Sequence, residues 1–390
     1  MDFRDSPDEA AFRQEVRDFL AAELPSLARR EDEDEAGGGL DRYGAYPEWQ
    51  RKLAARGWVA PAWPREYGGA GLTVLQQVVF NEEMARARAP RPGGVGVNYA
   101  GPTIILHGSD DQKREHLRPI LSGEVIWCQG FSEPEAGSDL AGLQTRAVRD
   151  GDDYVVNGQK IWTSGAQFAR RMILLARTDP QAPKHKGISY FLLDMKSPGV
   201  TIRPLMNMAG VPGFNEVFFD NVRVPRRDLL GEENRGWYYA TTTLDFERSS
   251  IGAAMAQVNA VEDLVQFARQ AGNGGVSSHL RAELGERAVE TQTARLLSLR
   301  VGTLQARGLV PNYEASCAKL YASELSQRVA VTALRLIGLH GQLGRGSPRA
   351  PLAGRLMRGY LWSPAITIAG GTSEIQRGII AIRGLGLPRG

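Results

Sequence analysis

The middle of the chain, from about residue 125 to 225, is strand-like in sequence, whereas the stretches on both sides are helix-like. Its short segments are rich in β-branched and aromatic residues, and Gly-Asp, Asn-Gly, Asp-Pro and Pro-Gly pairs separate them as turns. Outside it, apolar residues recur at the spacing of amphipathic helices. Because strands and helices occupy separate blocks and do not alternate, we predict an α+β fold and not a parallel α/β sheet.

This block order predicts three domains. We expect an N-terminal all-α domain over residues 1–124, a middle β domain over 125–232 and a C-terminal helical domain over 233–390. Ser6-Pro7-Asp8-Glu9 predicts the first helix start, with Ser6 as the cap and Glu9 completing a capping box. Further helical periodicity covers segments at about 73–88, 100–108, 110–122, 236–271, 278–307, 312–340 and 371–384.

Charge and composition exclude several classes of partner. The 390 residues carry a net charge of only +3, and no basic run is interleaved with aromatic residues, so we expect no nucleic acid. The acidic run at 31–35 is predicted to be a solvated loop. No stretch of 18 apolar residues occurs, and therefore no membrane span is expected.

The cysteines and the start of the sequence bear on the compartment. Cys128 and Cys317 are the two cysteines, which is too few for a disulfide framework and fits a reducing compartment. The first residues are acidic and lack an apolar signal core. The expected localisation is therefore cytoplasmic.

Common catalytic motifs are missing. The five histidines are dispersed, without a His-Glu-x-x-His pattern or a Cys/His cluster, so no metal site is expected. No G-x-S-x-G elbow and no P-loop occur. The Gly-rich segments 68–74 and 93–99 lack the third glycine and the βαβ context of a dinucleotide fold. These features disfavour a hydrolase, a P-loop enzyme and a Rossmann dehydrogenase.

Three blocks of polar residues and glycines remain, SEPEAGSD at 132–139, KIWTS at 160–164 and GTSEIQR at 371–377. In order and approximate spacing they resemble the acyl-CoA dehydrogenase family, flavoproteins that desaturate acyl-CoA thioesters between Cα and Cβ. The resemblance runs from the first helix to the C-terminus. It implies FAD as cofactor, and a fold with an N-terminal helical domain, a middle β-barrel or sandwich and a C-terminal four-helix bundle.

The resemblance also implies which residues bind FAD. A flat isoalloxazine ring must be sandwiched, with hydrogen bonds to its polar edge. The Ser132 hydroxyl and nearby amides would bond the N5/O4 side, and Trp162 would pack on the ring, although a lone tryptophan in a strand is ordinarily a core residue. The implied cofactor-binding residues are Gln129, Phe131, Ser132, Gly137, Ser138, Trp162, Thr163, Ser164, Arg269, Arg335, Thr372 and Glu374.

The reaction needs a base that removes the proton α to the thioester carbonyl, and a carboxylate with a raised pKa suits this role. Many family members place a Glu immediately before the Gly-Thr-Ser turn, but this chain has Gly370 there. Members that resemble the isovaleryl and long-chain types supply the Glu from an earlier helix, within a Glu-Arg pair. Here that pair is Glu247-Arg248, so Glu247 is the predicted catalytic base, against the alternative of a solvated ion pair. The implied substrate-binding residues are Ser138, Asp245, Arg248, Gly370 and Gly371.

Two departures from the family pattern concern the adenosine half of the FAD site. Many members present an Arg-x-x-Phe-Gly run to the FAD pyrophosphate of a neighbouring subunit, and here Arg269, within 267–280, is the substitute. Many also carry a Gln where this chain has Arg335. These changes resemble a branch that includes α2β2 enzymes for steroid side chains. A homotetramer, as a dimer of dimers, is expected, and a hetero-oligomer stays open.

Three functions are compatible with these residues. The leading one is an acyl-CoA dehydrogenase that passes electrons to an electron-transfer flavoprotein. The second is a flavin oxidase of the same fold, which rapid re-oxidation in air would reveal. The third is a non-catalytic partner chain, which the retention of Glu247, Ser132 and Trp162 disfavours. The acyl group, and whether CoA or a carrier protein bears it, stay open.

Overall fold

The computed structural model describes residues 4–24, 47–90, 93–246, 251–270, 275–344 and 346–389. The chain forms two compact units. The first, here called the helical unit, comprises residues 1–36, 72–89 and 248–390, and the second, the mixed unit, comprises 37–71 and 90–247. The acidic run at 31–35 and the pair Glu247-Arg248 lie outside the described residues. The three domain boundaries stay a prediction.

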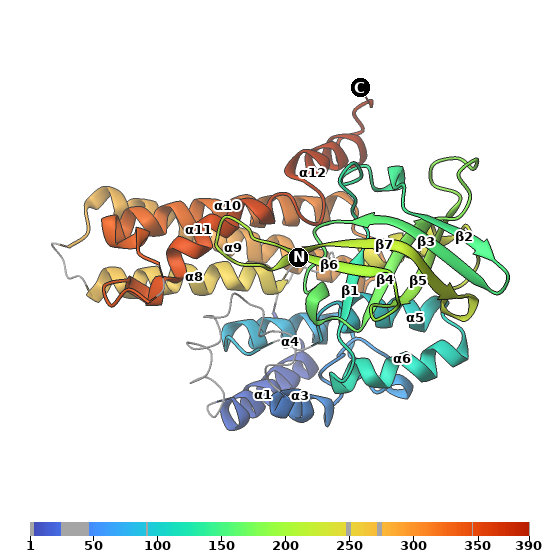
Figure 1. Cartoon of the computed structure of the whole chain (residues 1–390). Helices are drawn as coiled ribbons and strands as arrows, with labels where there is room; N and C mark the ends of the chain where they lie inside the picture. The colour runs from blue at the N-terminus through green and yellow to red at the C-terminus, as the bar shows by residue number, and fades with distance from the viewer. Residues whose placement is uncertain are drawn as a thin grey trace. The chain divides into compact units, whose positions relative to one another are not determined.

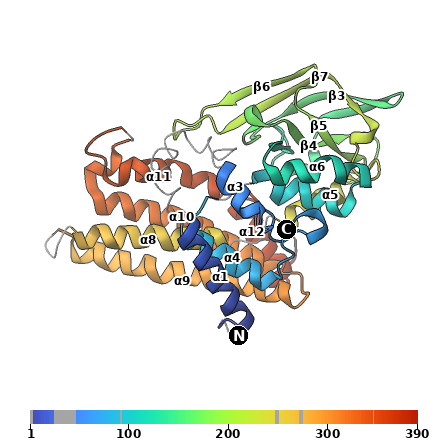
Figure 2. The same cartoon turned by 90° about the horizontal axis from the view of Figure 1, so that it is seen from below.

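The helical unit contains a bundle in which α8 (Ile251–Gln270), α9 (Ser278–Ala306) and α10 (Tyr313–Ile337) run side by side with α11 (Arg355–Ile366) (Figures 1 and 2). Leu264, Leu284 and Leu325 are among its buried core residues. The four-helix bundle is therefore confirmed. The sequence did not indicate α11, whose interior contains Gly359 and Pro364, both poor helix formers.

Two N-terminal helices belong to the same unit, α1 (Pro7–Glu23) and α4 (Val74–Arg86). The predicted capping box is confirmed, because Ser6 N donates to Glu9 Oε2 at 2.7 Å and Glu9 N donates to Ser6 Oγ at 3.3 Å. Buried charges join the helices. Arg13 donates to Glu82 and Glu83 at 2.8 and 2.6 Å, and Arg295 of α9 donates to Glu82 at 2.5 Å.

Among its described residues, the mixed unit contains a seven-stranded sheet and four α-helices. The strands are β1 (Trp127–Gly130), β2 (Arg146–Asp150), β3 (Asp153–Lys160), β4 (Arg171–Arg177), β5 (Ile188–Asp194), β6 (Val200–Leu205) and β7 (Phe214–Pro225). The helices are α3 (Pro47–Ala54), α5 (Gly101–His107), α6 (Asp110–Ser122) and α7 (Gly236–Phe246). The strand order is β1-β4-β2-β3-β7-β6, and β5 pairs with the free edge of β4. Strands β1 and β4 pair in parallel, whereas most other neighbours are antiparallel.

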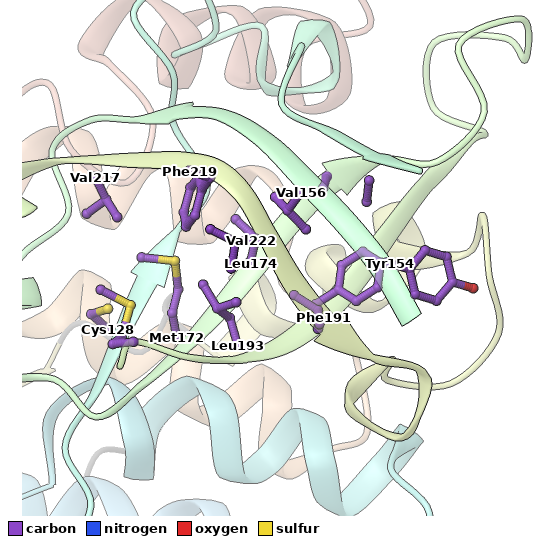
Figure 3. Packing of buried hydrophobic residues seen from close by; sticks show 14 of the residues in the cluster. Cys128, Tyr154, Val156, Met172, Leu174, Phe191, Leu193, Val217, Phe219 and Val222 are labelled. Atoms are coloured by element: carbon purple, nitrogen blue, oxygen red, sulfur yellow. The ribbon is translucent and has the colours of Figure 1, made fainter. Parts of the chain in front are cut away.

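The core of the mixed unit lies between β4–β5 and β3–β7. Met172 and Leu174 of β4 face Phe191 and Leu193 of β5, and they pack with Tyr154 and Val156 of β3 and Val217, Phe219 and Val222 of β7 (Figure 3). Alternate residues of β4 and β5, among them Ile173 and Tyr190, are also fully buried. These two strands are therefore covered on both faces, which explains why their sequences are continuously apolar.

One turn prediction was wrong. The pair Asn157-Gly158, predicted as a turn, lies inside β3, where the register with β7 shifts between Val156 and Gly158. Gly158 has φ 149°, and a Cβ at this position would lie 2.6 Å from the Thr145 hydroxyl oxygen. The missing side chain thus permits a β-bulge in which a neighbouring strand lies close. In the sequence, an Asn-Gly pair at such a bulge cannot be told from an Asn-Gly pair at a turn.

Gly101, at the start of α5, packs directly on Trp63, and a Cβ there would overlap the indole ring. We expect Gly101→Ala to lower the free energy of unfolding by about 1–3 kcal/mol through overpacking. The matched control is Gly285→Ala in α9, where a Cβ meets nothing within 4 Å. That change should stabilise the protein by about 0.5–1 kcal/mol through helix propensity. Thermal unfolding followed by circular dichroism measures both, and equal midpoints would contradict the packing argument.

Candidate functional site

The structure brings the first and second sequence blocks together at one end of β1 and β3 in the mixed unit. Gln129 is half-buried in β1, and Phe131 and Ser132 follow directly, with Phe131 buried. The Ile161 N–H donates to the Ser132 carbonyl oxygen at 2.9 Å. This hydrogen bond joins the second block to the first, directly beside Trp162 and Phe131.

A buried ion pair strengthens the same junction. The Lys160 side chain is fully buried, and its Nζ donates to Glu133 Oε1 at 2.8 Å and to the Phe131 carbonyl oxygen at 3.0 Å. Glu133 also accepts from the backbone N–H groups of Gln144 and Thr145 at 2.6 and 2.9 Å. Burial lowers the pKa of Lys160 to about 8, and the Glu133 carboxylate opposes this decrease. Burial raises the pKa of Glu133, but Lys160 and the donors around the carboxylate bring it below its usual value.

The rest of the first block forms a tight turn. Glu133 and Ala136 exchange backbone hydrogen bonds of 3.0 Å in both directions. The turn presents Gly137 and Ser138 to solvent, and a Cβ on Gly137 would meet nothing within 4 Å. The next residue, Asp139, forms an ion pair with Lys184. The two predicted ligand-contacting residues are therefore accessible.

Trp162 is not a core residue. It lies outside the strands, its φ is 59°, and 59% of its surface is exposed. Its ring meets Phe214 edge-on, with the ring centroids 5.8 Å apart. A non-glycine residue with positive φ is strained, and such strain concentrates at functional sites. This geometry disfavours the core-aromatic interpretation and leaves the indole available to a flat ligand.

Thr163 is fully buried beside this exposed ring. Its N–H donates to the Asn215 carbonyl oxygen at 3.0 Å, and Asn215 Nδ2 donates back to the Thr163 carbonyl oxygen at 2.9 Å. Its hydroxyl oxygen, however, has no hydrogen-bond partner among the described residues. Ser164 is half-buried. A buried hydroxyl is ordinarily paired, so Thr163 fits a site that a ligand completes.

The third block lies in the helical unit, at the start of the short helix α12 (Ser373–Ile379). Gly370 and Gly371 have φ angles of 65° and 88°. Lys319 Nζ donates to the Gly371 carbonyl oxygen at 2.7 Å, and Gln376 Nε2 donates to that of Gly370 at 3.0 Å. The Thr372 hydroxyl caps the helix by accepting from Ile375 N at 3.2 Å.

A cleft of about 480 Å³ opens beside this turn, lined by Glu324, Gln327, Arg328, Thr367, Ile368, Thr372, Ser373 and Glu374. The hydroxyl oxygen of Ser373 is buried there and has no partner within the described part of the chain. Glu374 is exposed, and its own backbone N–H and the Thr372 hydroxyl lower its pKa. The cleft therefore contains polar groups that a polar ligand could satisfy.

The remaining predicted residues are placed as follows. Arg269 is exposed in the last turn of α8. Arg335 lies in the last turn of α10, and its NH1 group is 3.2 Å from Glu283 Oε1. Asp245 belongs to the last turn of α7. Glu247 and Arg248 lie outside the described residues, so the role of the catalytic base stays a prediction.

Sequence reasoning missed Glu133, Lys160 and Asn215. The sequence did indicate that Lys160 is buried. Side chains alternate between the two faces of a strand, and Lys160 is an even number of residues from the inward-pointing Tyr154 and Val156. A charged residue at an inward position needs a buried partner. Nothing in the local sequence identified Glu133 as that partner.

Family models match nearly the whole chain. The acyl-CoA dehydrogenase N-terminal domain matches residues 6–124, the middle domain 128–222 and the C-terminal domain 234–385. The acyl-CoA dehydrogenase FadE26 of Mycobacterium tuberculosis is 35% identical over 98% of both chains. The acyl-CoA dehydrogenase FadE34 of the same organism is 39% identical over 96% of this chain, which spans only 51% of that relative's length. A solved structure, the Tcur3481-Tcur3483 steroid ACAD, superposes with a TM-score of 0.88 at 35% identity and complete coverage of both chains.

These matches define the class of protein as a flavin-dependent oxidoreductase with three domains. The chain belongs to the acyl-CoA dehydrogenase family, and its cofactor is FAD. The residues of the site fit this cofactor, since the exposed Trp162 ring and the unpaired Thr163 hydroxyl are adjacent in sequence. Across the described ranges, no helix has the length and apolar character needed to cross a membrane.

Thr163→Val tests whether the unpaired hydroxyl serves FAD. Because this hydroxyl has no partner in the described protein, its removal should leave the stability of the FAD-free protein unchanged or slightly higher. It should weaken FAD binding about 2- to 10-fold, the worth of one hydrogen bond. Equilibrium titration of the apoprotein with FAD measures the affinity, and thermal unfolding measures the stability.

The matched control is Thr178→Val in the same unit. The Thr178 hydroxyl is bonded to Asn234 Oδ1 at 2.6 Å and to Ser189 Oγ at 2.7 Å. Its loss should lower the free energy of unfolding by about 1 kcal/mol and leave the FAD affinity unchanged. The same FAD affinity in Thr163→Val as in the wild type would show that this hydroxyl does not contact the cofactor.

Proposed function

We propose that this chain oxidises an acyl-CoA thioester to the trans-2-enoyl-CoA, with Glu247 removing the α-proton. The observation that carries the proposal is the junction of the first two blocks, where Ser132, Trp162 and Thr163 are held next to one another. The proposed FAD contacts are Gln129, Phe131, Ser132, Gly137, Ser138, Trp162, Thr163, Ser164, Arg269, Arg335, Thr372 and Glu374. The proposed substrate contacts are Ser138, Asp245, Arg248, Gly370 and Gly371.

The chemistry that FAD would supply here, when bound, is an acceptor at N5 for the hydride that leaves Cβ. The side chains of this protein perform the remaining tasks. The Ser132 and Thr163 groups donate hydrogen bonds to the polar edge of the ring and orient it. Trp162 covers one face of the ring and excludes water. The exposed turn at Gly137-Ser138 leaves room for the CoA arm to pass.

The backbone at Gly370 supports Glu247 as the base. Gly370 replaces the Glu that many family members carry, and its φ of 65° lies in the left-handed region, which a Glu adopts only with strain. Glu247 directly follows the last residue of α7 and is the acidic member of the Glu-Arg pair. A carboxylate suits the removal of this proton, and Glu247 is the proposed base.

The proposed substrate carries a bulky acyl group. Gly370 has no side chain, which leaves space where other members carry a Glu. A solved relative that matches the whole chain is described as a steroid ACAD. We therefore propose a ring-bearing or branched acyl group, and an electron-transfer flavoprotein as the acceptor of the electrons.

Glu247→Gln should slow anaerobic bleaching of the bound flavin by acyl-CoA about 10²- to 10⁴-fold, because the amide cannot take the α-proton. FAD should stay bound. The measurement is the visible flavin spectrum during addition of a panel of linear, branched and ring-bearing acyl-CoAs. Glu262→Gln, an exposed carboxylate on α8, is the control and should bleach at the wild-type rate.

Full bleaching activity in Glu247→Gln would overturn the assignment of the base. Bleaching of the wild type by linear acyl-CoAs alone would overturn the proposed substrate class. Rapid re-oxidation of the bleached enzyme in air would identify an oxidase instead of a dehydrogenase. A wild-type protein that binds no flavin would favour the non-catalytic partner chain.

The assembly is proposed to be a tetramer that includes a second chain of the same family. The solved relative has the joint name Tcur3481-Tcur3483, and around Arg269 the chain lacks the run that many family members present to the FAD of a neighbouring subunit. Expressed alone, the chain should therefore bind FAD, but less than one FAD per polypeptide. Flavin content and molar mass by light scattering are the measurements. One FAD per chain in a homotetramer would contradict the second chain.

A further inference from the structure

We propose that Lys160 is a positioning residue for the flavin: its buried ammonium group orients and polarises the Phe131–Ser132 peptide and so raises the reduction potential of bound FAD. The inference rests on the proposed placement of the flavin edge at Ser132 and Thr163. It concerns a residue that lies outside the proposed set of FAD contacts. It therefore acts through the peptide that it holds.

The hydrogen bonds of Lys160 define which peptide is affected. Its Nζ donates to the carbonyl oxygen of Phe131 at 3.0 Å. That carbonyl and the Ser132 N–H belong to the same planar peptide group. A cation at the oxygen withdraws electron density through the amide and makes its N–H a stronger donor. Negative charge that arrives on the flavin during reduction is then stabilised more strongly by Ser132.

The surroundings keep this cation charged and fixed. Lys160 has no exposed surface, and Glu133 binds the ammonium at 2.8 Å. Glu133 is itself held by the N–H groups of Gln144 and Thr145. Burial lowers the pKa of Lys160 to about 8, but the Glu133 carboxylate at 2.8 Å favours the charged ammonium. The low dielectric of a buried site strengthens its effect on the neighbouring peptide.

The same lysine also fixes the geometry of the second block. Lys160 ends β3, and the next N–H, that of Ile161, donates to the Ser132 carbonyl oxygen. The chain then turns at Trp162, whose φ of 59° is maintained although it is strained. The Lys160 side chain thus binds the peptide before Ser132, and the Ile161 N–H binds the peptide after it. Replacement of Lys160 removes the first of these two hydrogen bonds, the one to the Phe131 carbonyl oxygen.

The experiment measures the midpoint potential of FAD in purified holoenzyme by equilibration with reference dyes. Lys160→Met removes the ammonium group and keeps an unbranched side chain that reaches as far as the Cε atom. We expect the equilibrium constant for two-electron reduction to fall about tenfold, which corresponds to a potential about 30 mV lower. The measurement needs bound FAD but no substrate. The control is Tyr154→Phe, which removes a hydrogen bond of 2.8 Å to Glu233 in the same unit and should leave the potential unchanged.

Lys160→Met leaves Glu133 as an unpaired buried carboxylate, which destabilises proteins strongly. If this variant does not fold, the double variant Lys160→Met, Glu133→Gln is used, in which both side chains are neutral. The amide oxygen of the glutamine at 133 can still accept a hydrogen bond from a backbone N–H. The same decrease in potential is expected in that double variant. An unchanged potential in whichever variant retains FAD would overturn the inference and leave the ion pair a purely structural feature.

The outcomes separate this inference from the proposed function. A wild type that binds FAD but is not bleached by any acyl-CoA contradicts the proposed reaction, whereas the role of Lys160 is still decided by the potentials. A wild type that is bleached, with equal potentials in all variants, contradicts the role of Lys160 alone. A wild type without FAD overturns both.

Discussion

The ion pair between Lys160 and Glu133 holds together segments that are separate in the sequence. Lys160 ends β3, Glu133 follows β1, and the carboxylate accepts from the N–H groups that lead into β2. Burying two charges costs several kcal/mol each, so such a pair persists only where hydrogen bonds satisfy both groups. Here, besides their mutual bond, Lys160 donates to the Phe131 carbonyl oxygen and Glu133 accepts from the chain entering β2. The arrangement of the proposed flavin edge therefore depends on this pair.

The packing beneath the pair makes the arrangement rigid. Strands β4 and β5 are buried on both faces, with Met172 and Phe191 inside the sheet core (Figure 3). A core of this density resists small displacements. The strained backbone at Trp162 is supported by Asn215, whose side chain and backbone both bond to Thr163. Strain at one exposed residue can thus be maintained because its neighbour is fixed by two buried hydrogen bonds.

Local signals predicted most of the elements, and contacts between distant residues explain what they missed. The capping box at Ser6 and Glu9 involves residues three apart, so the sequence predicts it directly. The Asn157-Gly158 pair is different, because Thr145 on the neighbouring strand determines whether the glycine serves a turn or a bulge. The resemblance likewise indicated Ser132 and Trp162, but not the partner of Lys160, which lies 27 residues earlier in the chain. The placement of Glu247 depends on residues outside the described ranges.

At Arg335, one of the departures from the family pattern, the existing contact contributes little to the free energy of folding. Arg335 is 59% exposed and its ion pair with Glu283 is solvated, a type of pair worth about 0–1 kcal/mol. A phosphate group binds a guanidinium through two charge-assisted hydrogen bonds, which are stronger than this contact. The ion pair with Glu283 is therefore no obstacle to the proposed role for Arg335 in the adenosine half of the FAD site. The retained first and second blocks, by contrast, are tied to Lys160, which has no exposed surface, and a change there would leave the Glu133 carboxylate buried without its cation. This difference in the cost of substitution is consistent with a proposed adenosine half that departs from the family pattern and a proposed isoalloxazine half that follows it.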